Sequence, residues 1–172
     1  ITLATLSIAR GLALGLSGGQ PIPGMPDIVQ LIGGGSVGSI APWLPWSAFL
    51  VAAVAILVAI FLTKLVWGRW IYAVGGSPDG ARNLGIPRNW VLVSVYILSG
   101  LMAGIAAIVT AGRLNAGSPT FGDLAELDSI AAVVIGGASF LGGRGNVGNA
   151  LIGALMIGVI RNGMNLLNVD AF

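Results

Sequence analysis

The sequence contains no cysteine and no histidine, and it has few charged residues. Of its 172 residues, 8 are Lys or Arg and 6 are Asp or Glu, so charged side chains make up 8%, against roughly 25% in a typical soluble domain. Without cysteine and histidine, disulfides, thiol nucleophiles, Ser-His-Asp triads and the usual metal sites are excluded. So few ionisable side chains cannot cover a soluble domain of this size. The composition excludes the water-soluble class and predicts no catalytic residue and no metal site, and the net charge of +2 does not indicate nucleic-acid binding.

Apolar residues are abundant instead, at 56%, and 28 glycines accompany them. A helix needs roughly 20 mostly apolar residues to cross about 30 Å of hydrocarbon. A shorter apolar segment cannot cross alone, and it predicts a half-helix or re-entrant segment surrounded by protein. The predicted spans are about 1–17, 43–63, 89–111 and 147–169, and the short segment is 130–141. The sequence predicts an all-α fold, a polytopic transmembrane helical bundle in a single domain over 1–172. No cationic leader segment is visible, and we expect an interior part of a larger membrane protein.

The distribution of charge predicts how the spans are oriented. Residues 64–88 carry four cations and one acid, which are Lys64, Arg69, Arg82, Arg88 and Asp79. Residues 113–128 carry one cation and three acids. Because cytoplasmic loops are enriched in Lys and Arg, residues 64–88 are predicted to be cytoplasmic, and 113–128 and 18–42 to lie outside.

Glycines and two arginines are the candidates for helix packing or for the pathway. Gly100 and Gly104 form a GxxxG pair, a spacing that lets helix backbones approach closely. Arg10 lies in the middle of an apolar segment and is predicted to pair with backbone carbonyls or a carboxylate within the bundle. Arg161 is near the end of its span and is predicted to reach the lipid headgroups. The candidates are Arg10, Gly100, Gly104, Gly136 and Gly137.

Acidic and glycine-rich segments near 130–148 have local interpretations. Glu126 and Asp128 precede the short segment, and they are predicted to cap its helix and to favour the helix dipole. Residues 143–148 spell GxGxxG, but a predicted membrane helix follows them instead of a βαβ unit. This motif is interpreted as a tight turn that allows close packing.

The cytoplasmic segment 75–88 contains a short predicted helix. Ser77, Pro78 and Asp79 supply an N-cap, a proline at the first helical position and an early acid. Gly85 is expected to end the helix, which leaves one exposed cationic face. The alternative is a polar loop helix without a partner.

Three segments resemble the permease of ribose-type ABC sugar importers, in order and in spacing. They are TLSIARGLALGLSGGQPIPG (5–24), YAVGGSPDGARNLGI (72–86) and ELDSIAAVVIGGASFLGGRGNVGNALIGALMIGVIRNGMNLLNV (126–169). The resemblance implies a multi-pass protein of the bacterial inner membrane that forms the translocation pathway. The matching cytoplasmic coupling region is represented here by Gly75, Gly76, Ser77, Pro78, Asp79, Ala81, Arg82 and Gly85. The family usually has Asn where Ser77 stands.

The resemblance also implies partners and leaves alternatives open. The implied partners are a cytoplasmic ABC ATPase that binds ATP and Mg²⁺, a second permease copy in a homo- or heterodimer, an extracytoplasmic sugar-binding protein and membrane lipid. The chain itself would hold no cofactor. The alternatives are a branched-chain amino-acid-type ABC permease and a passive channel or secondary transporter without an ATPase.

Overall fold

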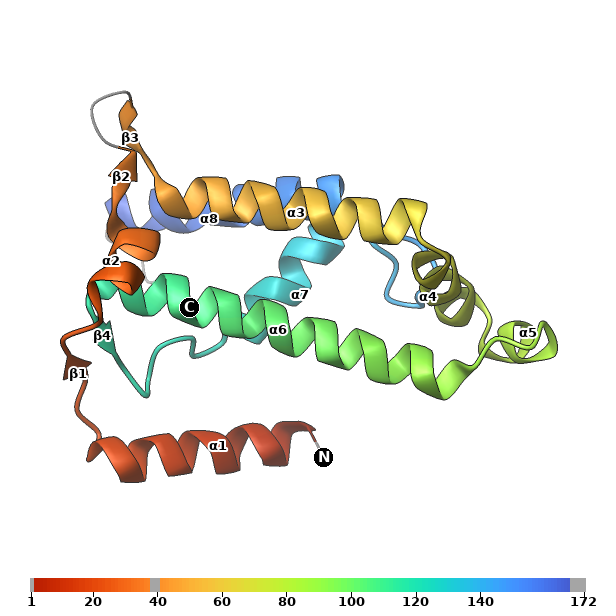
Figure 1. The fold of residues 1–172 in the computed structure, drawn as a ribbon, viewed down its shortest axis with the longest axis horizontal. Helices are drawn as coiled ribbons and strands as arrows, with labels where there is room; N and C mark the ends of the chain where they lie inside the picture. Colours follow the sequence, from red (N-terminus) through yellow and green to blue (C-terminus); the bar gives the residue numbers. More distant parts are fainter. Residues whose placement is uncertain (1, 38–40, 168–172) are drawn as a thin grey trace. The chain divides into compact units, whose positions relative to one another are not determined.

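The computed structural model describes residues 2–37 and 41–167, and its elements are mainly helices (Figure 1). The helices are α1 (Thr2–Ser17), α2 (Asp27–Gly34), α3 (Trp46–Lys64), α4 (Val66–Gly76), α5 (Pro78–Asn83), α6 (Arg88–Leu114), α7 (Ala125–Ile135) and α8 (Val147–Leu166). The strands are β1 (Ile22–Pro23), β2 (Ser36–Val37), β3 (Ala41–Pro45) and β4 (Ala116–Gly117). They form two short antiparallel pairs, β1 with β4 and β2 with β3. The predicted all-α fold class is therefore confirmed.

Three helices of the described chain, α3, α6 and α8, are long and apolar enough to cross a membrane. α1 is also apolar but shorter, at 16 residues. α3 begins at Trp46 and not at the predicted 43, because Trp43 lies in β3. α6 extends beyond both ends of the predicted 89–111. Ile1 and residues 168–169 of the predicted spans lie outside the described residues.

The short helix α7 differs from its predicted position at 130–141. It begins at Ala125 and ends at Ile135, so the two acids predicted to precede it lie within its first turn. The residue at its N-cap is Leu124, and no side chain caps the helix, so the predicted capping by Glu126 or Asp128 is wrong. Their placement in the first turn still suits the helix dipole, which favours negative charge there.

Two helices occur in segments that were predicted to be mainly loop. α2 lies within 18–42, where the sequence predicted no helix, and α4 fills the first half of 64–88. α4 is amphipathic in sequence, since Trp67, Trp70, Ile71 and Val74 recur at helical spacing. This spacing was the signal that could have identified it.

The chain divides into two compact units, and the boundary falls within α3 and within α6. The first unit comprises residues up to 52 and 99–123. Here the β1–β4 pair is extended by the backbone N–H of Met25, which donates to Asn115 Oδ1 at 3.1 Å. Gly33 of α2 lies against the backbone of Gly112, where either glycine would clash if it carried a Cβ. These contacts fix α2 and β1 to the end of α6.

The second unit comprises residues 53–98 and those from 124 onward, and it contains the candidate site. Its hydrophobic cluster is formed by Val74, Ala81 and Val91, from α4, α5 and α6. α7 packs directly on α8, with Ala132 buried between them. Apart from these four side chains, no apolar side chain of residues 4–36 and 45–167 is buried. Helices with such exposed apolar surfaces suit contact with lipid or with other helices.

Candidate functional site

The start of α5 is formed by Ser77 and Pro78, as the sequence predicts. Ser77 has an extended backbone, and its Oγ accepts a hydrogen bond from the N–H of Gly80 at 3.1 Å. Pro78 occupies the first helical position, where the absent N–H would have no partner within the helix. Asp79 lies in the first turn and Arg82 in the last, so both charges are favourable to the helix dipole. The predicted helix start is confirmed.

The end of α5 is closed by Gly85, which adopts a φ of +75°. The N–H of Gly85 donates to the carbonyl of Arg82 at 3.0 Å, and the N–H of Ile86 donates to the carbonyl of Ala81 at 3.1 Å. This pair of bonds is the Schellman arrangement, in which glycine supplies the left-handed residue. Ile86 also packs against the hydrophobic cluster that contains Ala81. The predicted end at Gly85 is confirmed.

One buried side chain anchors α5 to its neighbours. Ala81 is 2% exposed, and with Val74 of α4 and Val91 of α6 it forms the hydrophobic cluster. The connection to α6 is short, because α5 ends at Asn83 and α6 begins at Arg88. The N–H of Val91 donates to the carbonyl of Pro87 at 3.2 Å at the start of α6. Packing against α4 and against the start of α6 therefore opposes a displacement of α5. The charge distribution predicts that both lie on the cytoplasmic side.

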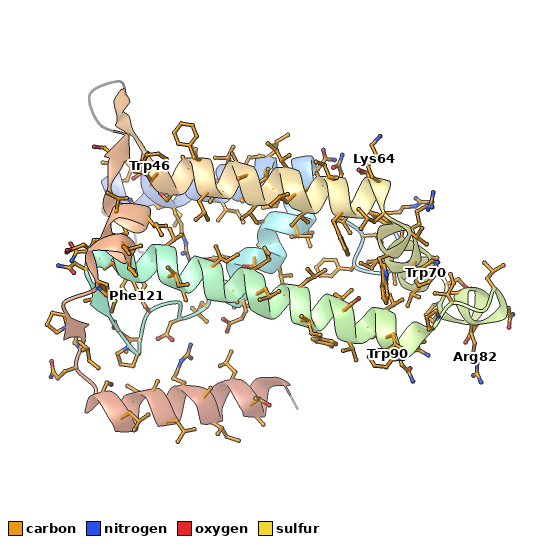
Figure 2. The ribbon with its side chains drawn as sticks, in the orientation of Figure 1. Trp46, Lys64, Trp70, Arg82, Trp90 and Phe121 are labelled. Atoms are coloured by element: carbon orange, nitrogen blue, oxygen red, sulfur yellow. The ribbon has the colours of Figure 1, made fainter. Side chains whose placement is uncertain are left out.

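The opposite face of α5 is exposed. Pro78, Asp79 and Arg82 are all exposed, and Leu84 at the C-cap is 79% exposed. Figure 2 shows the Arg82 side chain extending outward from α5. Among the described residues Arg82 forms no salt bridge within 4.0 Å. Its guanidinium can therefore donate several hydrogen bonds to carboxylates or carbonyls of another subunit.

The predicted site residues Gly75 and Gly76 have a packing role in the structure. They end α4 and lie against Gly142 and Gly143, in the turn between α7 and α8. A Cβ on Gly142 would clash with the backbone of Gly75. The hydroxyl of Tyr72 donates to the carbonyl of Gly145 at 2.9 Å across the same contact. The structure thus joins the predicted coupling segment to a glycine turn about 70 residues farther along the sequence.

Tyr72 is not among the residues predicted from the sequence, and the 143–148 turn is predicted only as a local feature. Gly142 and Gly143 adopt positive φ values of +85° and +71°, which confirms the predicted tight turn. No local pattern in the sequence indicates that this turn meets α4. The small residues on both sides are compatible with such a contact, but they do not identify the partner.

The predicted intramembrane arginines both have carboxylate partners. Arg10 Nη2 lies 2.6 Å from Asp123 Oδ1, which agrees with its predicted pairing. Arg161 Nη1 lies 2.7 Å from Asp128 Oδ2, so Arg161 is held within the chain and not directed to headgroups alone. The first pair joins α1 to the segment that follows β4, and the second joins α8 to the first turn of α7.

The glycine candidates fall into two groups. Gly136 is the C-cap residue of α7 and lies against the backbone of Asn149 and Ala150 in α8, and Gly137 makes the following turn with a φ of +84°. Gly100 and Gly104, in contrast, face open space within the described chain, because a Cβ at either would meet nothing within 4 Å. A helix that packs against this GxxxG pair must therefore be one that does not contact it within the described chain.

Comparison with known proteins places this arrangement in one family. Residues 1–171 match the family described as branched-chain amino acid transport system / permease component. The chain is 40% identical over 173 residues to the ribose import permease protein RbsC of Bacillus subtilis, covering 99% of this chain and 52% of that protein. It is 36% identical over 173 residues to the D-allose transport system permease protein AlsC of Escherichia coli, covering 100% and 52%. It is 42% identical over 129 residues to the xylose transport system permease protein XylH of Haemophilus influenzae, covering 75% and 34%.

The chain spans about half the length of the curated relatives that it matches end to end. No solved structure matches the chain.

Proposed function

The chain belongs to the family of branched-chain amino acid transport system permease components, and we propose that it is the membrane-spanning subunit of an ATP-driven monosaccharide importer. Members of this family are transport permeases and not enzymes. With three helices that can cross a membrane, the chain is part of a multi-pass protein of the bacterial inner membrane. The proposed transport function is supported mainly by one observation, the identity of 36–40% to ribose and allose permeases along the whole chain.

The proposed importer contains further subunits. Import against a gradient requires an energy source, and this chain has no nucleotide-binding motif of its own. A cytoplasmic ATPase would supply that energy by binding ATP and Mg²⁺, and an extracytoplasmic binding protein would deliver the sugar. A second permease copy would complete the pathway, and Gly100 and Gly104 are available on α6 for close contact with another helix.

α5 is the proposed contact with the ATPase. A transmitting element must be compact, exposed to the partner and firmly attached to spanning helices. α5 meets these conditions, because Ala81 is buried against α4 and α6 while Asp79 and Arg82 are exposed. The remaining coupling residues shape the helix and its attachment, namely Ser77, Pro78 and Gly85 at its ends and Gly75 and Gly76 at the end of α4.

Reconstituted transport tests the proposal. The full-length permease is placed in vesicles with its ATPase and binding protein, and uptake of labelled ribose, allose, xylose and leucine is measured with and without ATP. We expect uptake of one of the sugars, and only with ATP and all subunits. ATP-dependent uptake of leucine alone would indicate an amino-acid permease. Flux without ATP or ATPase would indicate a channel or secondary transporter.

A further inference from the structure

The contact between the end of α4 and the α7–α8 turn has an unusual composition, because two backbones meet without side chains between them. Gly75 and Gly76 lie on one side, and Gly142 and Gly143 on the other. A Cβ on Gly143 would lie 2.5 Å from Gly76 Cα and 2.8 Å from its N. The Tyr72 hydroxyl bridges the edge of this contact by donating to the carbonyl of Gly145 at 2.9 Å.

The turn on the far side of this contact is rigidly attached to α7 and α8. The N–H of Ser139 donates to the carbonyl of Arg144 at 3.0 Å, which closes the turn on itself. Asn146 then caps α8, since its Oδ1 accepts from the N–H of Gly148 at 3.1 Å. Beyond the turn, Gly153 of α8 lies against Ala132 and Gly136 of α7, so closely that a Cβ would clash with the Ala132 carbonyl.

At their other ends α7 and α8 are joined by charge. The salt bridge between Asp128 and Arg161 has an N–O distance of 2.7 Å. α7, α8 and their turn are therefore held together at both ends and in the middle. Within this unit a continuous series of close contacts runs from α5 through the hydrophobic cluster to α4, and from Tyr72 to the turn.

We propose that Tyr72 is a positioning residue that keeps the 142–145 turn against α4, so that movement of α5 is transmitted to α7 and α8. This inference rests on the proposed transport function. Rigid groups of helices that move together are a common means of conformational coupling. The glycines allow the backbones of α4 and the turn to approach closely. The hydrogen bond from the Tyr72 hydroxyl fixes the position of the turn relative to α4. A merely structural tyrosine would affect stability, but it would not affect the number of sugars transported per ATP.

The first test is Tyr72→Phe, which keeps the ring and removes only the hydroxyl. The readout is the ratio of sugar transported to ATP hydrolysed in the reconstituted complex, for whichever of the three sugars the wild type takes up. We expect this ratio to fall about threefold to tenfold, since loss of one hydrogen bond shifts an equilibrium by roughly that factor. Copurification with the ATPase and hydrolysis itself should persist. Tyr96→Phe is the matched control, because Tyr96 is the other of the two tyrosines and is 69% exposed on α6.

A second variant tests the glycine contact independently. Gly143→Ala would place a methyl group against Gly76, and we expect it to reduce the same ratio at least as strongly. Part of its effect is backbone strain, because Gly143 has a φ of +71°. Gly19→Ala controls for this strain, since Gly19 has a φ of +75° and nothing within 4 Å of an added Cβ. The Gly19→Ala ratio should equal that of the wild type.

The outcomes separate this inference from the proposed function. An unchanged ratio in Tyr72→Phe, with normal uptake, would overturn the role of Tyr72 and leave the transport function intact. Loss of ATPase binding in Tyr72→Phe would also overturn it, because the residue would then serve assembly. If the wild type shows no ATP-dependent sugar uptake, the proposed function itself fails.

Discussion

At the scale of single residues, glycine has different effects at different positions of the same helix. Gly153 of α8 is buried against the backbone of α7, whereas Gly158, five residues farther along α8, meets nothing within 4 Å. Gly158 follows Ala154 by four residues, a small-residue spacing that favours close packing, whereas Gly153 has Asn149 and Ile157 at that spacing. The spacing therefore does not identify the glycine that packs. The structure makes this distinction, because the contact depends on which face of α8 meets α7.

Alanine at these two glycines should change stability in opposite directions. Gly153→Ala forces a methyl group against Ala132 and should reduce the free energy of unfolding by about 1–3 kcal/mol. Gly158→Ala adds no clash and should raise it by about 0.5–1 kcal/mol, because alanine is the better helix former. Thermal unfolding of the detergent-solubilised protein measures both. Equal effects of the two substitutions would contradict the α7–α8 contact.

The Asp128–Arg161 pair permits a second residue-scale test. Both side chains are partly exposed, 34% and 40%, so their interaction resembles a surface ion pair more than a buried one. A double-mutant cycle with Asp128→Asn and Arg161→Gln should give a coupling energy of about 0.5–1 kcal/mol. The cycle is measured by unfolding in detergent, and added salt should reduce the coupling. Additive single effects would mean that the two side chains do not interact.

At the scale of elements, local sequence signals predicted α5 well and its neighbours poorly. Ser77, Pro78 and Gly85 act within one or two turns of the backbone, so their consequences can be deduced without tertiary structure. The limits of α7 could not be deduced in this way, because apolarity alone suggested 130–141 and its charged first turn was excluded. Asp128 is accommodated in that turn by Arg161, a partner 33 residues away that sequence spacing does not reveal.

The cap of α5 provides an element-scale prediction. Ser77→Ala removes the acceptor for the N–H of Gly80 and should destabilise α5 locally by about 0.5–2 kcal/mol. Ser77→Asn should retain the cap, since asparagine is an equally good N-cap residue. Hydrogen exchange at the Gly80 and Ala81 amides is the measurement. Exchange should accelerate in Ser77→Ala and remain close to wild type in Ser77→Asn, and similar rates in all three proteins would contradict the role of the cap.

The exposed face of α5 provides a functional prediction. Arg82→Glu reverses the charge of a side chain without a salt-bridge partner among the described residues, so the fold of the permease should persist. We expect it to abolish uptake and transport-stimulated ATP hydrolysis, because the guanidinium would no longer donate to the ATPase. Membrane insertion and binding of the sugar-loaded binding protein should be retained.

The companion substitution for this test is Asp79→Lys, on the same exposed face of α5. Normal uptake from both variants would mean that this face does not contact the ATPase and that the coupling site lies elsewhere. Loss of insertion in Arg82→Glu would show that the arginine serves the fold of the permease.

At the scale of the whole molecule, membrane orientation determines whether these elements can perform their proposed roles. α3 and α6 can each cross a membrane, and the segment that connects them contains α4 and α5. Four cations lie between Lys64 and Arg88, against the single acid Asp79. The positive-inside rule predicts that this connection faces the cytoplasm, where ATP is available, and that the segment after α6 faces the outside.

Single cysteines test this orientation directly, because the native chain contains none and background labelling should be low. Asn83→Cys places a thiol at the exposed end of α5, and Thr120→Cys places one in the exposed segment after β4. An impermeant maleimide added to intact cells should label Thr120→Cys and leave Asn83→Cys unlabelled, whereas inverted membrane vesicles should give the opposite result. If intact cells labelled Asn83→Cys alone, α5 would lie on the side without ATP, and it could not contact the ATPase.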